Sequence, residues 1–283
     1  MDFQNAQLKN ANFARCHFEN CDFSESDLRD ANFQAAFMDY VSFENANLTG
    51  VRFTESIFED CNVGEASLED ADLTKAKFTG VDLSNINLTK LVIKETEFIL
   101  SDLSGSNLAS MDLSGCNFTD SDLTEADLTG CNFDRAICNQ TNFTQAKIIG
   151  GSFRDALLNT ALFTDSKLEE ADFSRADLRN TIFENANCIK AKFVNCRLEK
   201  SDFTSADCRA AQFSNADMPF AFLSYAQLDN ANFRGANLKQ AVMHRIEDNY
   251  TAWDGAKTKK AEYTDKDLQY AEDWTPPPPR DLE

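Results

Sequence analysis

The 283-residue sequence predicts an all-β fold, a solenoid whose chain coils around four flat sides. Two observations lead to this prediction. A large apolar residue returns at every fifth position from Phe3 to Met243, which makes 49 positions without an insertion or deletion. The residue two places before it is small, as at Ala6 and Cys16. A period of five fits neither an α-helix, with 3.6 residues per turn, nor a plain strand, with two.

The five-residue unit also contains a turn. The 49 central positions hold 21 Phe and 19 Leu, and Gly or Asn often ends the unit, as at Gly50 and Gly80. Such residues tolerate the positive φ that tight turns require. Two inward side chains and one turn per unit let four units close a square coil of 20 residues. About twelve coils, stacked about 4.8 Å apart, then give a rod roughly 58 Å long in which each coil is buried by its neighbours.

Several units follow one consensus, among them ADLTK, ADFSR, ANFRG, SDLTE and ADLTG. They resemble the A(D/N)Lxx unit of the pentapeptide-repeat family, and the resemblance covers residues 1–245. The family fold is a right-handed quadrilateral β-helix. The resemblance implies this handedness, which the periodicity does not supply.

Residues 246–275 lie beyond the repeat, and we expect them to cap the last coil, because solenoids need a covered end. The candidate capping residues are the aromatic side chains Tyr250, Trp253, Tyr263 and Trp274. The stretch TDKDLQYAEDW can start a short helix with Thr264 or Asp265 as N-cap. Residues 276–283, which include four consecutive prolines, are expected to form a flexible tail. Between Ile86 and Leu100 we expect an irregular coil, because Ile86 and Leu91 enlarge the small position.

The charge balance restricts the partners. Lys and Arg number 27 against 47 Asp and Glu, for a net charge of −20. An acidic chain repels nucleic acid and anionic membranes, so we expect a protein partner with a basic surface, although the charge also serves solubility. The opening MDFQNAQLKN has no signal-peptide character, and no apolar stretch approaches membrane-spanning length.

The nine cysteines all fall at inward positions of the repeat, which indicates small buried hydrophobes in a reducing, cytoplasmic protein. Cys188 and Cys208 lie one coil apart, within reach of a disulfide, so a bridge between them is an open alternative.

The acidic residues are concentrated on one side, which we call face one: residues 1–5, 21–25, 41–45 and so on every 20. Over residues 1–240, face one has twelve acidic residues and no Lys or Arg, whereas the net charges of the other three faces are about −2, +2 and −4. A family preference for Asp explains the acids but not the missing cations. The twelve are Asp2, Asp22, Glu25, Glu44, Glu65, Asp82, Asp102, Asp122, Glu125, Asp165, Glu184 and Asp202, of which our candidate binding residues are Asp22, Glu44, Glu65, Asp82, Asp102, Asp122, Glu125 and Asp165.

A second candidate surface is apolar. The outward position before the central residue holds Ile137, Leu157, Leu162 and Ile182, which should meet around one corner of the rod. Such a cluster marks a partner surface, including that of a homodimer, unless a distorted coil tucks it in. Smaller apolar sets of the same kind are Phe37 with Ile57, and Phe220, Phe222, Tyr225 and Val242.

Two functions follow. Some family members are acidic rods that bind DNA gyrase or topoisomerase, and the resemblance implies a DNA mimic that acts through face one. The alternative is a protein-interaction scaffold or effector that uses the apolar corner and the C-terminal aromatic residues. We do not expect an enzyme, a cofactor or a metal site, because no nucleophile–base pair, metal-ligand spacing or phosphate-binding glycine loop is readable and only two histidines exist.

Overall fold

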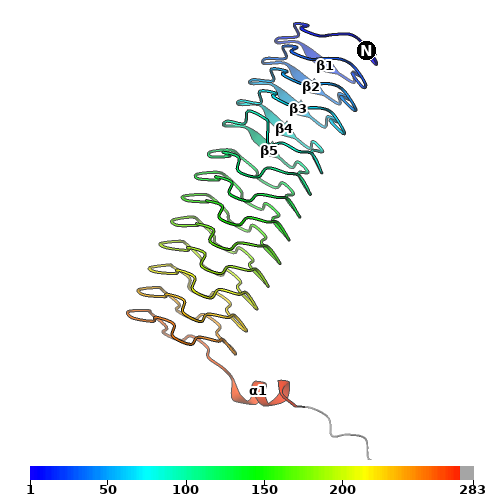
Figure 1. Cartoon of the computed structure of the whole chain (residues 1–283). Helices are drawn as coiled ribbons and strands as arrows, with labels where there is room; N and C mark the ends of the chain where they lie inside the picture. Colours follow the sequence, from blue (N-terminus) through cyan, green and yellow to red (C-terminus); the bar gives the residue numbers. More distant parts are fainter. Residues whose placement is uncertain (275–283) are drawn as a thin grey trace, which may run out of the picture.

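The computed structural model describes residues 1–274, and these form a long rod with a short helix at one end (Figure 1). Each coil pairs in parallel with the next at a register of 20 residues, from Asp2–Asp22 to Val242–Glu262. One side of the first five coils is regular enough to form strands, in the order β1-β2-β3-β4-β5. They are β1 (His17–Glu19), β2 (Phe37–Asp39), β3 (Ile57–Glu59), β4 (Lys77–Thr79) and β5 (Glu97–Ile99). The predicted right-handed quadrilateral β-helix is confirmed.

The solenoid is longer than the sequence indicated. We expected about twelve coils that end at residue 245, but the parallel pairing continues to Glu262, so residues 1–260 form thirteen coils. Asp248 interrupts the apolar series without interrupting the backbone pairing. Five residues later Trp253 resumes the series, and its ring stacks on Phe233 with centroids 4.5 Å apart. The proposed tail at residues 276–283 lies outside the described residues.

The core consists of the central side chains stacked from coil to coil. Phe163 and Phe183 lie 5.1 Å apart and nearly parallel, at 5° between their planes. Phe163 also meets Phe173 of the neighbouring side edge to face, at 84°. All three rings are fully buried. Burial of one Phe ring contributes about 1.5–3 kcal/mol, and most of its contacts come from the adjacent coils.

The backbone of each unit leaves one amide that needs a side chain. In unit 121–125, the amides of residues 122, 123 and 125 donate to neighbouring coils at 2.7–3.0 Å, and the Ser121 amide closes the preceding turn. The remaining amide, of Thr124, donates to Oδ1 of Asp122 at 2.9 Å. The Asp or Asn before the central residue is therefore the acceptor that completes the unit, because an unpaired amide is costly.

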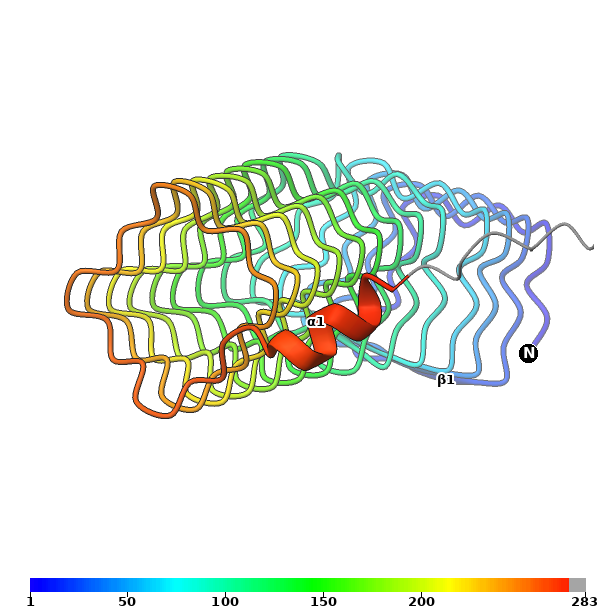
Figure 2. The same ribbon diagram turned by 90° about the horizontal axis from the view of Figure 1, so that it is seen from below.

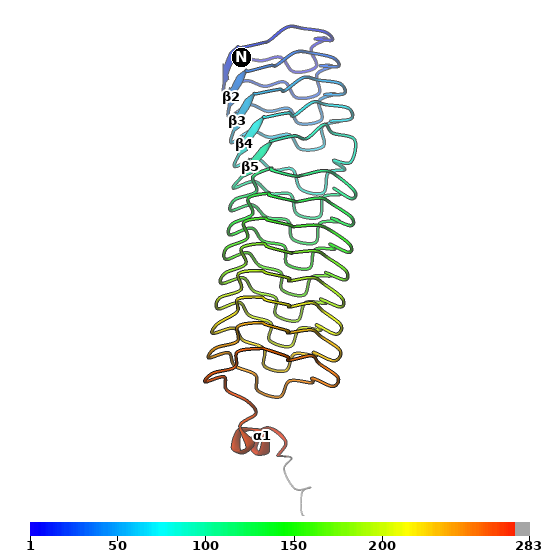
Figure 3. The ribbon, with the colours of Figure 1, turned by 90° about the vertical axis from the view of Figure 1, so that its left-hand side faces the viewer.

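The expected irregular coil is present at residues 81–100. Among the unit-ending residues from Asn5 to Lys260, Lys90 alone lacks a positive φ. Within the described chain, the bridges expected between Ser67 and Asn87 and between Val92 and Asp112 are missing. A groove of about 570 Å³ opens beside Val92, and the stacking visibly departs from regularity below β4 (Figure 3). The cause is steric, since Ile86 occupies a position built for a small side chain.

The cysteines are all free thiols. Eight are buried, but Cys16 is exposed, because its coil is the first and has no neighbour above it. Cys188 and Cys208 are stacked thiols without a disulfide, and burial raises the pKa of Cys188 well above its ordinary value.

The irregular coil predicts a local gap in hydrogen-exchange protection. The amides of Ile93 and Glu95 have no acceptor within residues 1–274, whereas those of Phe133 and Arg135, two coils further, donate to the next coil at 2.6 and 2.8 Å. We expect the first pair to exchange much faster than the second. Amide exchange followed by NMR measures both pairs at once, and equal protection would contradict the interrupted pairing.

Candidate interaction face

Face one presents a straight column of carboxylates. Asp82, Asp102 and Asp122 are paired coil to coil, so their side chains leave the same side of the rod about 4.8 Å apart. Oδ1 of each accepts the backbone amide two residues on, at 2.9, 2.8 and 2.9 Å. Oδ2 of each receives no hydrogen bond from residues 1–274. The repeat thus fixes the orientation of these carboxylates and leaves one oxygen of each available.

The other candidate acids share this face at different positions of the unit. Asp22 has the same backbone contact, and the hydroxyl and amide of Ser24 lower its pKa. Glu65, Glu125 and Asp165 end their units with φ of 55°, 59° and 56°. Glu44 follows a central Phe. The fold therefore places the predicted acidic residues on one side.

The carboxylates of face one are not neutralised by the protein. The structure has 17 ion pairs among residues 1–274, and none includes any of the twelve acids. On other faces, cations stack on carboxylates one coil away, as in Arg175–Asp155 at 2.7 Å. Like charges in register destabilise a sheet unless solvent or a partner offsets them. The charge of face one is consequently available to a ligand.

The predicted apolar corner lies in regular coils. Ile137 pairs with Leu157 on one side, and Leu162 pairs with Ile182 on face one. Leu157 is 42% exposed and the other three are half-buried, so no distorted coil hides them. Sequence reasoning did not connect Leu162 and Ile182 with Phe222 and Val242. The register does connect them, because all four stand in the same outward column of face one, with Asp202 between the pairs.

Helix α1 (Lys266–Glu272) is attached at the lower end of face one. Glu272 accepts from the Tyr225 hydroxyl, contacts Nε2 of His244 at 3.2 Å and pairs with Arg245 at 3.0 Å. Asp273 adds a second pair to Arg245 at 2.8 Å. The Tyr225 hydroxyl, with His244 and Arg245, lowers the pKa of Glu272 to about 2. The first basic residue of face one, Arg245, is thereby neutralised.

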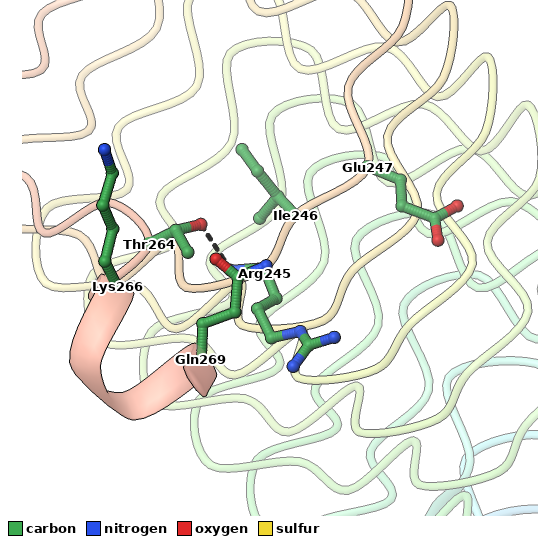
Figure 4. Close-up of a pocket in the computed structure, with 6 residues that line it drawn as sticks. All are labelled: Arg245, Ile246, Glu247, Thr264, Lys266 and Gln269. Atoms are coloured by element: carbon green, nitrogen blue, oxygen red, sulfur yellow. Dashed lines mark hydrogen bonds between the residues drawn. The ribbon is translucent and has the colours of Figure 1, made fainter. Parts of the chain in front are cut away.

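The helix is attached at its two ends and buries none of its residues. At its start, Asp265 caps it by accepting the amides of Asp267 and Leu268, which confirms the second of the two predicted N-caps. The Thr264 hydroxyl accepts the Arg245 amide at 3.0 Å (Figure 4). An open cleft of about 460 Å³ lies between α1 and the last coil. Viewed from the C-terminal end, α1 lies beside the last coil and not across it (Figure 2).

The expected aromatic cap is therefore incomplete. Trp253 packs on the coil above it, but Tyr250 is 91% exposed, and Tyr263 and Trp274 are also exposed. Tyr250 ends its unit at a φ of 59°, a position that directs the side chain outward. Only one of the four residues covers the core. Trp253 holds a central position within the last coil, whereas Tyr263, which falls in the same frame, lies beyond that coil.

The part of the chain that the structure describes has neither a metal site nor a membrane-spanning helix. No three His, Cys, Asp or Glu side chains converge as a metal site would require. No helix there is long and apolar enough to cross a bilayer.

Comparisons with known proteins agree with the fold. The family model described as "Pentapeptide repeat region" matches residues 1–73, 39–108 and 116–193, and that described as "Pentapeptide repeats (8 copies)" matches residues 181–219 and 206–245. No curated protein matches this chain in sequence.

Several solved structures are similar. QnrB1, a plasmid-mediated fluoroquinolone resistance protein, is 16% identical over 83% of this chain and 92% of that chain, with a TM-score of 0.36. HetL from the cyanobacterium Nostoc, involved in heterocyst differentiation regulation, is 20% identical over 89% of this chain and 86% of that chain, with a TM-score of 0.22. Rfr23 from the cyanobacterium Cyanothece 51142 is 24% identical, with a TM-score of 0.26, and the match spans 32% of this chain and 59% of that chain. At these identities the likeness concerns the fold alone.

The attachment of α1 can be tested with two arginines. Arg245→Ala removes both ion pairs to the helix, so we expect the α1 amides to exchange faster and trypsin to cleave sooner after Lys266. Arg234→Ala is the matched control, because Arg234 pairs with Asp254 at 3.0 Å and does not contact α1. Equal behaviour of the two variants would show that the pairs to Arg245 do not hold the helix.

The same contact has a defined pH dependence. When folding lowers the pKa of a carboxylate, its charged form stabilises the folded state at any pH above the ordinary pKa, which is 4.5 for Glu272. This stabilisation is lost as the pH falls toward the lowered pKa of about 2. We therefore expect α1 to remain docked from pH 7 to about pH 5 and to detach between about pH 4.5 and 2. Exchange of the α1 amides measured across this range checks the prediction, and release above pH 5 would contradict it.

Proposed function

This chain belongs to the pentapeptide-repeat family, and we propose that it is a non-enzymatic binding protein whose face one contacts a protein with a basic groove. One observation carries the proposal. The twelve carboxylates of face one are free of ion pairs within the described chain, and no Lys or Arg shares that face before Arg245. A surface of one charge sign attracts and orients a partner of the other.

The partner class we favour is a DNA-binding enzyme. A rod about 60 Å long that displays about one carboxylate per coil, roughly every 5 Å, resembles a diluted DNA backbone, which carries one charge per about 1.7 Å. The backbone contacts of Asp82, Asp102 and Asp122 hold these charges in fixed positions, as phosphates are held on a duplex. DNA gyrase and topoisomerase are the candidates that the family resemblance offers.

The second candidate function is a scaffold without nucleic-acid mimicry. The exposed Leu157 and its neighbour Ile137, which lie outside face one, favour it. In this case Leu157→Asp would abolish partner binding, and the loss of charge on face one would not.

The main test uses DNA gyrase and a triple variant. The protein should alter gyrase supercoiling at low salt, with an effect that fades as salt rises, because screening weakens exposed charge pairs. Asp82→Asn, Asp102→Asn and Asp122→Asn together remove three charges and keep an acceptor for each backbone amide. At about 0.2–1 kcal/mol per exposed contact, the combined variant should need roughly 3- to 140-fold more protein for the same effect.

The matched control removes equal charge elsewhere. Asp120, Asp217 and Asp229 lie on other faces, and in residues 1–274 they accept hydrogen bonds from Gln140, Asn237 and Asn249 without ion pairs. Their combined Asn variant should act as the wild type does. The proposal fails if the wild type has no effect on gyrase in stoichiometric excess, or if both triple variants lose activity equally.

A further inference from the structure

The lower half of face one differs in chemistry from the upper half. Its outward column continues without a break in register from Asp122 through Asn142 to Leu162, Ile182, Asp202, Phe222 and Val242. Four of the last five side chains are apolar. Phe222 is 44% exposed, and it is flanked along the chain by the exposed Phe220, which ends the preceding coil, and by the exposed Tyr225. The acidic column of coils five to seven therefore leads into an apolar column in coils nine to thirteen.

The apolar column leaves backbone amides of its units without their usual side-chain acceptor. At the other positions of this column, from Asp2 to Asp202, an Asp, Asn or Ser accepts the amide two residues on, as Asp202 does for Thr204 at 2.8 Å. Leu162, Ile182 and Phe222 cannot accept a hydrogen bond. In the described chain the corresponding amides of Thr164, Glu184 and Ser224 accordingly have no protein acceptor. Each of these units therefore lacks the side-chain hydrogen bond to its backbone amide and exposes an apolar side chain at that position.

The charges around the column fit a cationic partner as well as those of the upper half do. Asp165 and Glu184 lie on face one beside it, and Asp202 stands within it. At the foot, the carboxylates of α1 take up Arg245. The column is thus bordered by negative charge on a face with no unpaired Lys or Arg within residues 1–260.

We infer that Leu162, Ile182, Phe222 and Val242, with Phe220 and Tyr225, form an apolar anchor for the same partner that the acidic column attracts. The inference rests on the proposed function and specifies the partner further. Its basic groove must be bordered by an apolar ridge, which begins about 10 Å along the rod from the contact of Asp122 and reaches Phe222 after about 24 Å. The acids attract the partner in a salt-dependent way, and the apolar contact adds affinity that salt does not screen.

Substitution by Asn separates this role from a role in folding. Phe222→Asn with Val242→Asn removes the apolar surface without a change in charge and supplies acceptors for the amides of Ser224 and His244. The pair should unfold at the same temperature as the wild type or higher. Phe37→Asn with Ile57→Asn is the matched control, since these side chains hold the same position of the unit on another side of the rod.

The measurement is the dissociation constant for immobilised DNA gyrase at several salt concentrations, with the full chain. We expect the Phe222 and Val242 pair to bind at least tenfold more weakly at every salt concentration, with the slope of log Kd against log salt unchanged. The control pair should stay within about twofold of the wild type. The triple Asn variant of Asp82, Asp102 and Asp122 should instead lower the slope.

The outcomes separate this inference from the proposed function. If the Phe222 and Val242 pair binds as the wild type does while the triple variant binds more weakly, the anchor is wrong and the proposed function stands. If the wild type does not bind gyrase at low salt, the proposed function fails and the anchor fails with it. A lowered unfolding temperature for the Phe222 and Val242 pair would contradict the hydrogen-bond argument, because the weaker binding would then reflect damage to the fold.

Discussion

The amide-to-carbonyl pairing between successive coils, at a register of 20 residues, is the interaction on which the rest of the structure depends. It satisfies four of the five amides in a unit such as 121–125 when the closing turn is included, and a side chain must satisfy the fifth. The Asp or Asn before each central residue meets that need. This requirement stacks acidic side chains in columns, so the hydrogen bonding that completes the backbone also creates the surface charge of the protein.

The faces differ in whether that charge is neutralised by ion pairs. On three sides, cations one coil away pair with the carboxylates, as Arg197 does with Asp177 at 2.9 Å. On face one the same columns have no counter-ions, and α1 even neutralises Arg245 at the foot. Further down this face, the outward column holds Leu162, Ile182 and Phe222 in place of Asp or Asn, so the amide acceptor is lost there. Departures from local consistency are expected at sites under functional constraint, which is why face one and its apolar column are the surfaces we assign to a partner.

Much of the fold was predictable because it is a local property repeated many times. The period of five, the small and large inward residues and the turn residues follow from the sequence without knowledge of distant contacts. The errors came where the pattern is interrupted. The sequence indicated that the repeat ends before Asp248, because this residue interrupts the apolar series. The backbone pairing nevertheless continues to Glu262, since it does not require an apolar side chain in every unit. Tyr250, Tyr263 and Trp274 were expected to cap the rod because of their size, but their positions in the turns and beyond the last coil leave them exposed.

The sequence by itself determined the coil length, the core, the assignment of every outward residue to a face, and hence the absence of Lys and Arg from face one. It also indicated the irregular coil, since Ile86 and Leu91 do not fit the small position. Only the tertiary structure decided which acids are paired, where the coil pairing opens beside Val92, and how α1 binds Arg245 through Glu272 and Asp273. The physical reason is that the repeat fixes the positions of the backbone and the core through neighbouring residues. Ion pairs and helix docking depend instead on how far particular side chains reach, and the period of the repeat does not specify this.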